Sequence, residues 1–211
     1  MPAFAAKPST ETHYVMSMRS LLLFILTSLL LATSLPLQAG PLSDGLRAFE
    51  VGDYQRALAF WKPLAEKNDP DALYNIGLLY MKGLGVKQDY RAAKHWFKQA
   101  AKYGSVDAAY NLGVMYKQRR FGYPSSKDAL YWWRQAAERG HPESMFNLGV
   151  MLAYGNGTKK DVPAALELWQ KAASKGNRNA IETLAKVYEQ GLLGISPDPQ
   201  RAQYWRKRMP R

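Results

Sequence analysis

The sequence predicts an all-α protein, built as an array of about five stacked helical hairpins behind an N-terminal signal peptide. The evidence is a set of glycines that recur every 36 residues, helix-capping residues with the same period, and a short apolar run near the N-terminus. A repeat of this length is typical of helical solenoids, in which each unit buries its apolar face against the next. The chain has 211 residues, of which 47% are apolar and 22% charged, so it can form a core.

Residues 1–39 are interpreted as an N-terminal extension and a secretory signal peptide. A short basic segment, Met18–Ser20, precedes the apolar run Leu21–Leu31, and small residues lead to a cleavage site after Ala39. The run is shorter than the roughly 20 residues that a spanning helix needs, so a cleaved signal is favoured over a retained anchor. We therefore expect export across the inner membrane and a periplasmic location.

The composition excludes several kinds of site. The chain has no cysteine, which excludes disulfides, thiolate metal sites and a cysteine nucleophile. His13, His95 and His141 are too scattered to suggest a metal cluster, and we expect no metal and no cofactor. The net charge is +12, and loss of residues 1–39 would lower it only to +11, since that segment holds two basic residues and one acidic residue. Such a charge favours acidic partners or anionic surfaces.

The repeats divide residues 40–211 into units of about 42–68, 69–104, 105–140, 141–176 and 177–211. Each unit is predicted to hold two helices. Four sets of small or aromatic residues recur every 36 residues: Gly77, Gly113 and Gly149; Gly104, Gly140 and Gly176; Ala100-Ala101, Ala136-Ala137 and Ala172-Ala173; and Phe97, Trp133, Trp169 and Trp205. The fifth unit carries Ala185 where the mid-helix glycine belongs.

Capping residues predict where each helix begins and ends. The first helices are expected to begin at Asp69, Ser105, His141 and Asn177, and the second helices at Asp89, Ser125, Asp161 and Asp198. Gly-x-Gly loops and single glycines should end them in left-handed conformations. The mid-helix glycines predict a tight helix crossing, with the Ala-Ala pairs as the facing surface. The six tryptophans (Trp61, Trp96, Trp132, Trp133, Trp169 and Trp205) should fill the space between hairpins.

Four patterns together resemble a known family. They are Ala-x-Tyr-Asn-Leu-Gly-x-x-Tyr at 108–116, Gly-x-Gly at 83–85, Asp-x-x-x-Ala-x-x-Trp-Phe at 89–97 and Ala-Ala-x-x-Gly at 100–104. This combination resembles the Sel-1-like repeat, a relative of the tetratricopeptide repeat, over about 42–208. The resemblance implies a right-handed α/α superhelix that acts as a scaffold or adaptor, in many cases in a bacterial envelope.

A hairpin solenoid has a concave face lined mainly by its first helices, and this face is the expected binding surface. Asn75, Asn111 and Asn147 form a ladder whose amides suit the main chain of an extended peptide, a role that the resemblance also supports. The alternative is that each asparagine bonds a neighbouring helix and holds the stack. Tyr74 and Tyr110 lie beside the ladder, either as binding residues or as packing residues.

The third unit departs from the others at its loop. In place of Gly-x-Gly it has a basic and aromatic segment, which includes Arg119, Arg120, Phe121 and Tyr123. Arginine beside aromatic rings can bind carboxylates, phosphates or sugars. The alternative is a loop that has diverged without a function.

The sequence favours a non-enzymatic adaptor that binds a peptide or a partner protein. A second hypothesis is a basic protein that binds an envelope polymer (lipid phosphate, peptidoglycan or exopolysaccharide), based on Arg119, Arg120 and the arginines near the C-terminus. Nucleic acid is not an expected partner, and contact with a membrane is expected only through an uncleaved signal or a partner. Catalytic motifs are not found, so a hydrolase is the remote alternative.

Overall fold

The computed structural model describes residues 40–120, 122 and 124–209 of the chain. Over these residues it contains ten α-helices and one short 3₁₀ helix, and no strand. The helices are α2 (Pro41–Glu50), α3 (Tyr54–Glu66), α4 (Pro70–Lys82), α5 (Tyr90–Lys102), α6 (Val106–Lys117), α7 (Ser126–Glu138), α8 (Pro142–Tyr154), α9 (Val162–Ser174), α10 (Arg178–Gln190), η1 (Leu192–Gly194) and α11 (Pro199–Arg206). The prediction of an all-α fold is confirmed.

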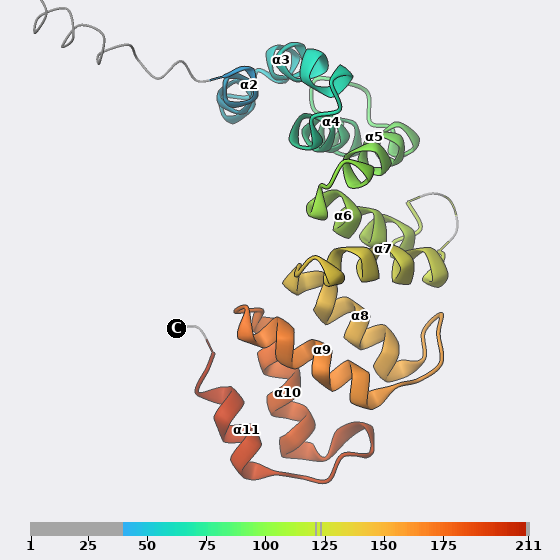
Figure 1. The fold of residues 1–211 in the computed structure, drawn as a ribbon, viewed down its shortest axis with the longest axis vertical. Helices are drawn as coiled ribbons and strands as arrows, with labels where there is room; N and C mark the ends of the chain where they lie inside the picture. Colours follow the sequence, from blue (N-terminus) through green and yellow to red (C-terminus); the bar gives the residue numbers. More distant parts are fainter. Residues whose placement is uncertain (1–39, 121, 123, 210–211) are drawn as a thin grey trace, which may run out of the picture. The chain divides into compact units, whose positions relative to one another are not determined.

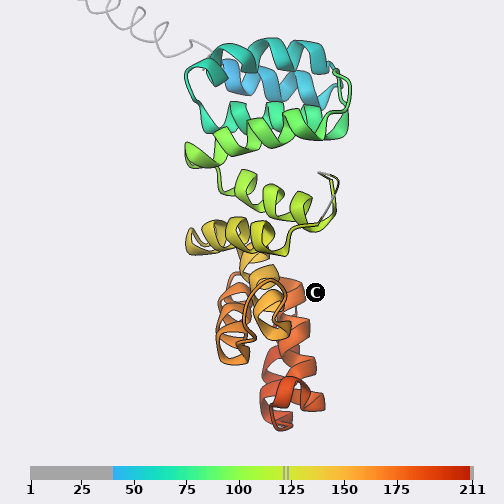
Figure 2. The ribbon, with the colours of Figure 1, turned by 90° about the vertical axis from the view of Figure 1, so that its right-hand side faces the viewer.

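The helices form five hairpins: α2/α3, α4/α5, α6/α7, α8/α9 and α10/α11 (Figures 1 and 2). Each helix packs mainly against the helix before it and the helix after it in the sequence, so each second helix also contacts the first helix of the next hairpin. This is the arrangement of a helical-hairpin solenoid, in which one repeat covers the apolar side of the next.

The predicted caps are confirmed at the starts of α4 to α11. The side chains of Asp69, Ser105, His141 and Asn177 accept main-chain N–H bonds at the first helices of their units, and Asp89, Ser125, Asp161 and Asp198 do so at the second helices. Each cap satisfies donors that have no partner inside the helix.

Left-handed residues end the helices, as predicted. Gly83 and Gly155 follow α4 and α8 with φ of 71° at both positions. Arg119 occupies the equivalent position after α6 and has a φ of 60°, a conformation that disfavours a residue with a Cβ atom. At this position the divergent loop therefore keeps the left-handed conformation of its siblings without the glycine.

The mid-helix glycines do permit a close helix crossing, but the predicted facing surface is wrong. The atoms nearest to each glycine belong to an aromatic ring of the second helix and not to an Ala-Ala pair. A Cβ atom added to Gly77 would lie 2.7 Å from the ring of Phe97, and one added to Gly149 would lie 2.5 Å from Trp169 Nε1. A large planar ring needs more room than a methyl group, which explains why a glycine stands opposite it.

Only part of the tryptophan prediction is confirmed. Trp61, Trp133 and Trp169 are buried, whereas Trp96, Trp132 and Trp205 are half-buried. Each buried indole donates its N–H to a main-chain carbonyl of the first helix in its own hairpin; the acceptors are Leu42 at 3.3 Å, Tyr110 at 3.3 Å and Phe146 at 3.1 Å. These bonds satisfy the one polar atom of each buried ring.

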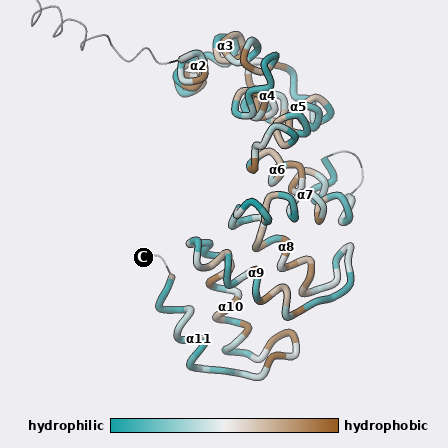
Figure 3. Tube along the Cα trace, viewed as in Figure 1, coloured by the Kyte–Doolittle hydropathy of each residue, from teal (hydrophilic) through white to brown (hydrophobic). Residues whose placement is uncertain are grey.

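The buried side chains form two clusters. The N-terminal core holds buried residues of α2 to α6, and the C-terminal core holds buried residues of α7 to α11. The division falls within the third hairpin, and half-buried side chains of α6, such as Tyr110 and Val114, pack against the C-terminal core. The last helix, α11, is mainly hydrophilic (Figure 3), which suits a helix that has no following repeat to cover it.

The predicted signal peptide, residues 1–39, lies outside the described residues. Within the described part of the chain, none of the helices has the length and apolar character needed to cross a membrane.

Candidate functional site

The three ladder asparagines lie on the first helices of successive hairpins: Asn75 on α4, Asn111 on α6 and Asn147 on α8. All three are half-buried. The Nδ2 atom of Asn111 donates to the Tyr74 hydroxyl at 3.2 Å and to the main-chain oxygen of Asp107 at 3.1 Å. Within the described residues, the side chains of Asn75 and Asn147 make no hydrogen bond. Asn111 thus joins two repeats through a hydrogen bond that the other two asparagines do not make.

The two candidate tyrosines are packed into the stack. The Tyr74 ring lies 5.7 Å from that of Phe97, and the Tyr110 ring stacks on His141 at 4.7 Å. Burial raises the pKa of both phenols, and the carboxylates of Asp107 and Glu143 add to this for Tyr74 and Tyr110 respectively. For Tyr74, the hydrogen bond from Asn111 acts in the opposite direction. Both phenols are therefore protonated hydrogen-bonding groups at neutral pH and not bases.

The divergent loop of the third hairpin contacts the second hairpin through Arg120. The Nη1 atom of Arg120 donates to the Tyr90 hydroxyl at 2.9 Å, and its guanidinium carbon lies 5.1 Å from the centre of that ring. Arg119 is exposed. Phe121 and Tyr123 lie outside the described residues.

One open cavity brings the ladder and the loop together. Its volume is about 370 Å³, and both Asn111 and Arg120 line it. The other lining residues are Met81, Lys82, Gln88, Tyr90, Val114, Met115 and Gln118. Asn75, Asn147 and Arg119 do not line this cavity. Its cations, amides and aliphatic side chains suit the main chain and a carboxylate of a peptide.

A model of the Sel1 repeat matches five segments, at residues 42–69, 70–105, 106–141, 142–177 and 182–208. The chain belongs to the Sel1 repeat family. Proteins of this family generally act as scaffolds for protein interactions and are generally non-catalytic. A search of curated protein sequences found no match.

Two solved structures resemble this Sel1 repeat protein in sequence as well as in fold. A Sel1 repeat protein from Oxalobacter formigenes is 32% identical, with a TM-score of 0.73, over 79% of this chain and 70% of that one. The protective antigen c5321, present in uropathogenic Escherichia coli strains, is 27% identical with a TM-score of 0.70. That match covers 80% of this chain and 37% of the antigen, so the chain spans well under half of the antigen's length.

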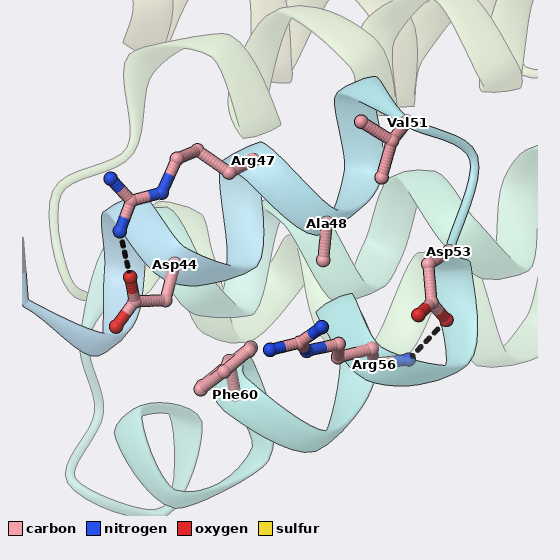
Figure 4. Close-up of a pocket in the computed structure, with 7 residues that line it drawn as sticks. All are labelled: Asp44, Arg47, Ala48, Val51, Asp53, Arg56 and Phe60. Carbon is pink, nitrogen blue, oxygen red and sulfur yellow. Dashed lines mark hydrogen bonds and ion pairs between the residues drawn. The ribbon is translucent and has the colours of Figure 1, made fainter.

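A second cavity of the Sel1 repeat protein, of about 390 Å³, lies between α2 and α3 (Figure 4). Its charges are largely satisfied from within. Arg47 pairs with Asp44, and Asp53 accepts the main-chain N–H of Arg56. The Arg56 guanidinium lies 5.8 Å from the centre of the Phe60 ring. Since acids balance the arginines here, this cavity offers less to a charged ligand than the one beside Arg120.

Three arginines in or just after α11 also have partners within the chain. Arg201 pairs with Asp198 at 3.1 Å, Arg206 pairs with Glu189, and the Arg208 guanidinium lies 3.5 Å from the centre of the Tyr204 ring. These contacts weaken the part of the polymer-binding hypothesis that depends on C-terminal charge.

The histidines occupy structural or exposed positions in the described residues. The Nδ1 atom of His141 accepts the main-chain N–H of Ser144 at 3.2 Å, and its Nε2 lies 3.3 Å from a carboxylate oxygen of Asp107. His95 is exposed beside Trp96. Over the described part of the chain, no three acidic or histidine side chains cluster as metal ligands would.

A basic groove lies between α5 and α7, and the sequence did not predict it. Its charged and aromatic lining residues are Lys98, Lys102, Tyr131, Trp132 and Arg139. The signal was visible: the α5 segment carries four basic residues and no acid, and Tyr131-Trp132 are adjacent aromatic residues in a helix. The groove itself could not be seen, because α5 and α7 are in different repeats.

Proposed function

We propose that this Sel1 repeat protein is a non-enzymatic adaptor of the bacterial envelope, which binds a segment of a partner protein on the face of its first helices. The sequence predicts this face to be concave. The observation that carries the proposal is the cavity lined by both Asn111 and Arg120, with the unbonded amides of Asn75 and Asn147 in the neighbouring repeats. Extended peptides are recognised through such main-chain partners.

A photo-crosslinking amino acid at Gln118, which lines this cavity, tests the site directly. We expect a protein adduct from an envelope extract, and loss of that adduct when Arg120→Ala is added. The matched control places the same crosslinker at Ala59, an exposed position of α3 far from this cavity in the sequence. Equal adducts from both positions would contradict the proposed site.

The asparagines need a separate variant, since Asn111 also supports the fold. We expect Asn75→Ala/Asn147→Ala to fold like the wild type and to bind the crosslinked partner about tenfold more weakly, in the range seen when interface hydrogen bonds are removed. A folded double variant that retains full affinity would show that the ladder is not part of the site.

The envelope location rests on residues 1–39 and is part of this proposal. Expression of the full chain in a bacterial host should give a mature protein in the periplasmic fraction that begins at Gly40. Intact-mass measurement checks this. An unprocessed chain in the cytoplasm would contradict the proposed location without bearing on the binding face.

The second candidate, an envelope-polymer binder, is supported by Arg119 and Arg120 and by the net charge of the chain. Binding to isolated peptidoglycan or anionic vesicles that declines steeply with salt, and is lost in Arg119→Ala/Arg120→Ala, would favour it over the adaptor.

A further inference from the structure

The groove between α5 and α7 is formed mainly by the second helices of two successive hairpins. Both helices pack against α6, and they enclose a volume of about 290 Å³. The small side chains of Ala101 and Ala109 line it together with long side chains from both helices, and Ala109 is 4% exposed. The long side chains are Lys98, Lys102, Tyr131, Trp132, Gln135 and Arg139.

The charge of this groove is unbalanced. Three cations line it and no carboxylate does. Within the described residues, Lys98, Lys102 and Arg139 form no ion pair, although the exposed Glu138 is adjacent to Arg139 in the sequence. Lys94, Lys98 and Lys102 also follow one another at four-residue spacing on α5, where like charges destabilise a helix. An anionic ligand would relieve this repulsion.

The aromatic side chains add an apolar surface to the charge. Tyr131 is 55% exposed and its ring contacts that of the half-buried Trp132 at 5.0 Å between centres. Such rings can pack on an apolar or aromatic side chain, while the neighbouring cations and the amide of Gln135 bind carboxylates. The combination suits a segment that carries both kinds of side chain.

The equivalent positions one repeat later have a different chemistry. There Glu138, Glu167 and Leu168 replace Lys102, Tyr131 and Trp132, and Glu167 pairs with Lys171 at 2.6 Å. A long polyanion that ran along the second helices would meet these acids, whereas a short ligand would not. The unpaired positive charge of the groove therefore favours a short acidic segment over a long polyanion.

We propose that the groove between α5 and α7 binds a short acidic segment of a partner protein that carries an aromatic or aliphatic residue. This site is separate from the face of the first helices and does not depend on it. It would give the adaptor a second contact surface, and acidic segments are a recognised target of clustered basic residues.

The probe is a short fluorescent peptide of glutamates with one central phenylalanine, followed by fluorescence anisotropy. We expect the wild type to bind it, with affinity that falls as salt rises. Lys98→Glu/Arg139→Glu should weaken binding by about tenfold or more, because it reverses two of the three groove cations.

The repeat supplies a matched control. Arg134 and Lys175 stand one repeat after Lys98 and Arg139, so Arg134→Glu/Lys175→Glu changes the net charge equally at the equivalent positions of the next repeat. We expect this control to alter affinity by less than about threefold. Equal losses from the two pairs would overturn the proposal, since binding would then follow net charge alone.

Two further measurements separate the occupants. Trp132→Leu, which introduces the residue of the next repeat, should weaken the phenylalanine peptide more than an all-glutamate peptide; equal effects would overturn the apolar part of the proposal. Polygalacturonate that binds more tightly than the peptide, and whose binding is lost equally in both charge-reversal variants, would show a polymer surface instead.

Asn75→Ala/Asn147→Ala should leave peptide binding unchanged, so failure of this site and failure of the first-helix site are distinguishable.

Discussion

Glycines opposite aromatic rings set the spacing within the second, third and fourth hairpins. Gly113 faces Trp133 and Gly149 faces Trp169, and in each pair the indole N–H bonds the first helix close to the glycine. Glycine within a helix is unfavourable by about 1 kcal/mol relative to alanine. The buried ring and its hydrogen bond offset this loss.

The Gly113→Ala variant tests whether a methyl group at this position stabilises or destabilises the fold. Helix propensity alone predicts that the variant is more stable by about 1 kcal/mol. Because the new methyl group would overlap the Trp133 ring, we expect instead a loss of about 1–3 kcal/mol from overpacking. Gly113→Leu should lose at least as much. Urea denaturation followed by circular dichroism measures the change, and a more stable Gly113→Ala variant would disprove the pairing.

Arg119 stores strain at the divergent loop. Its φ of 60° is unfavourable for a residue with a Cβ atom, and Gly83 and Gly155 hold the same position in the neighbouring units. We expect Arg119→Gly to stabilise the protein by about 0.5–1 kcal/mol. The reverse change, Gly155→Ala, should destabilise it. If Arg119→Gly is instead less stable, the side chain must contribute contacts that outweigh the backbone strain.

At the scale of single residues, the caps could be predicted and the facing pairs could not. A cap such as Asp89 bonds main-chain groups two or three residues away, so local sequence is sufficient. The partner of Gly113 lies 20 residues later, on another helix. Gly113 and Trp133 each recur every 36 residues, but a shared period does not show that two positions lie close together in space. Likewise, nothing in the sequence joins Arg120 to Tyr90, 30 residues earlier.

At the scale of the helices, a side-chain cap such as Asp89 at the start of α5 stabilises its own helix. The main-chain N–H groups of Ala92 and Arg91 bond the Asp89 carboxylate and hold its pKa below the ordinary value of 3.8. A carboxyl whose pKa is lower in the folded state stabilises the fold fully above its unfolded pKa. That contribution is lost as the pH falls through the folded value.

The Asp89→Ser variant separates the hydrogen bonds of the cap from the titration of its carboxylate. Serine keeps an oxygen acceptor at the start of α5 but has no charge to lose. At pH 7 we expect the variant to be nearly as stable as the wild type, because the serine oxygen can still accept the main-chain N–H bonds. Below about pH 4, the stability of the variant should decline less steeply than that of the wild type. Melting temperatures from pH 2 to pH 7 measure both slopes, and parallel curves would show that the Asp89 cap does not titrate with folding.

The sequence predicted the helices better than the grooves between them. Hairpins such as α4/α5 follow from the caps and glycines that bound each helix. The groove between α5 and α7 depends instead on which faces of two helices meet across α6, and helical periodicity alone does not give that. The cavity beside Asn111 was not predicted. The ladder and the loop of the third unit were identified separately, and only the fold shows that Asn111 and Arg120 line one cavity.

On the scale of the whole described chain, the repeats are coupled mainly to their neighbours. The buried residues fall into an N-terminal core in α2 to α6 and a C-terminal core in α7 to α11, which meet within the third hairpin. Arrays of this kind behave as a sum of unit stabilities and nearest-neighbour interfaces. A defect in one core should therefore be felt only weakly in the other.

Leu184→Ala and Ile76→Ala test this coupling as a matched pair. Both side chains are fully buried, Leu184 in the C-terminal core and Ile76 in the N-terminal core. Each substitution should remove about 2–5 kcal/mol from its own core. In native-state hydrogen exchange we expect Leu184→Ala to accelerate the amides of α8 to α11 more than those of α2 to α4, and Ile76→Ala to do the reverse. If both variants accelerate all helices equally, the chain unfolds as one cooperative unit, and the division between the two cores has no energetic consequence.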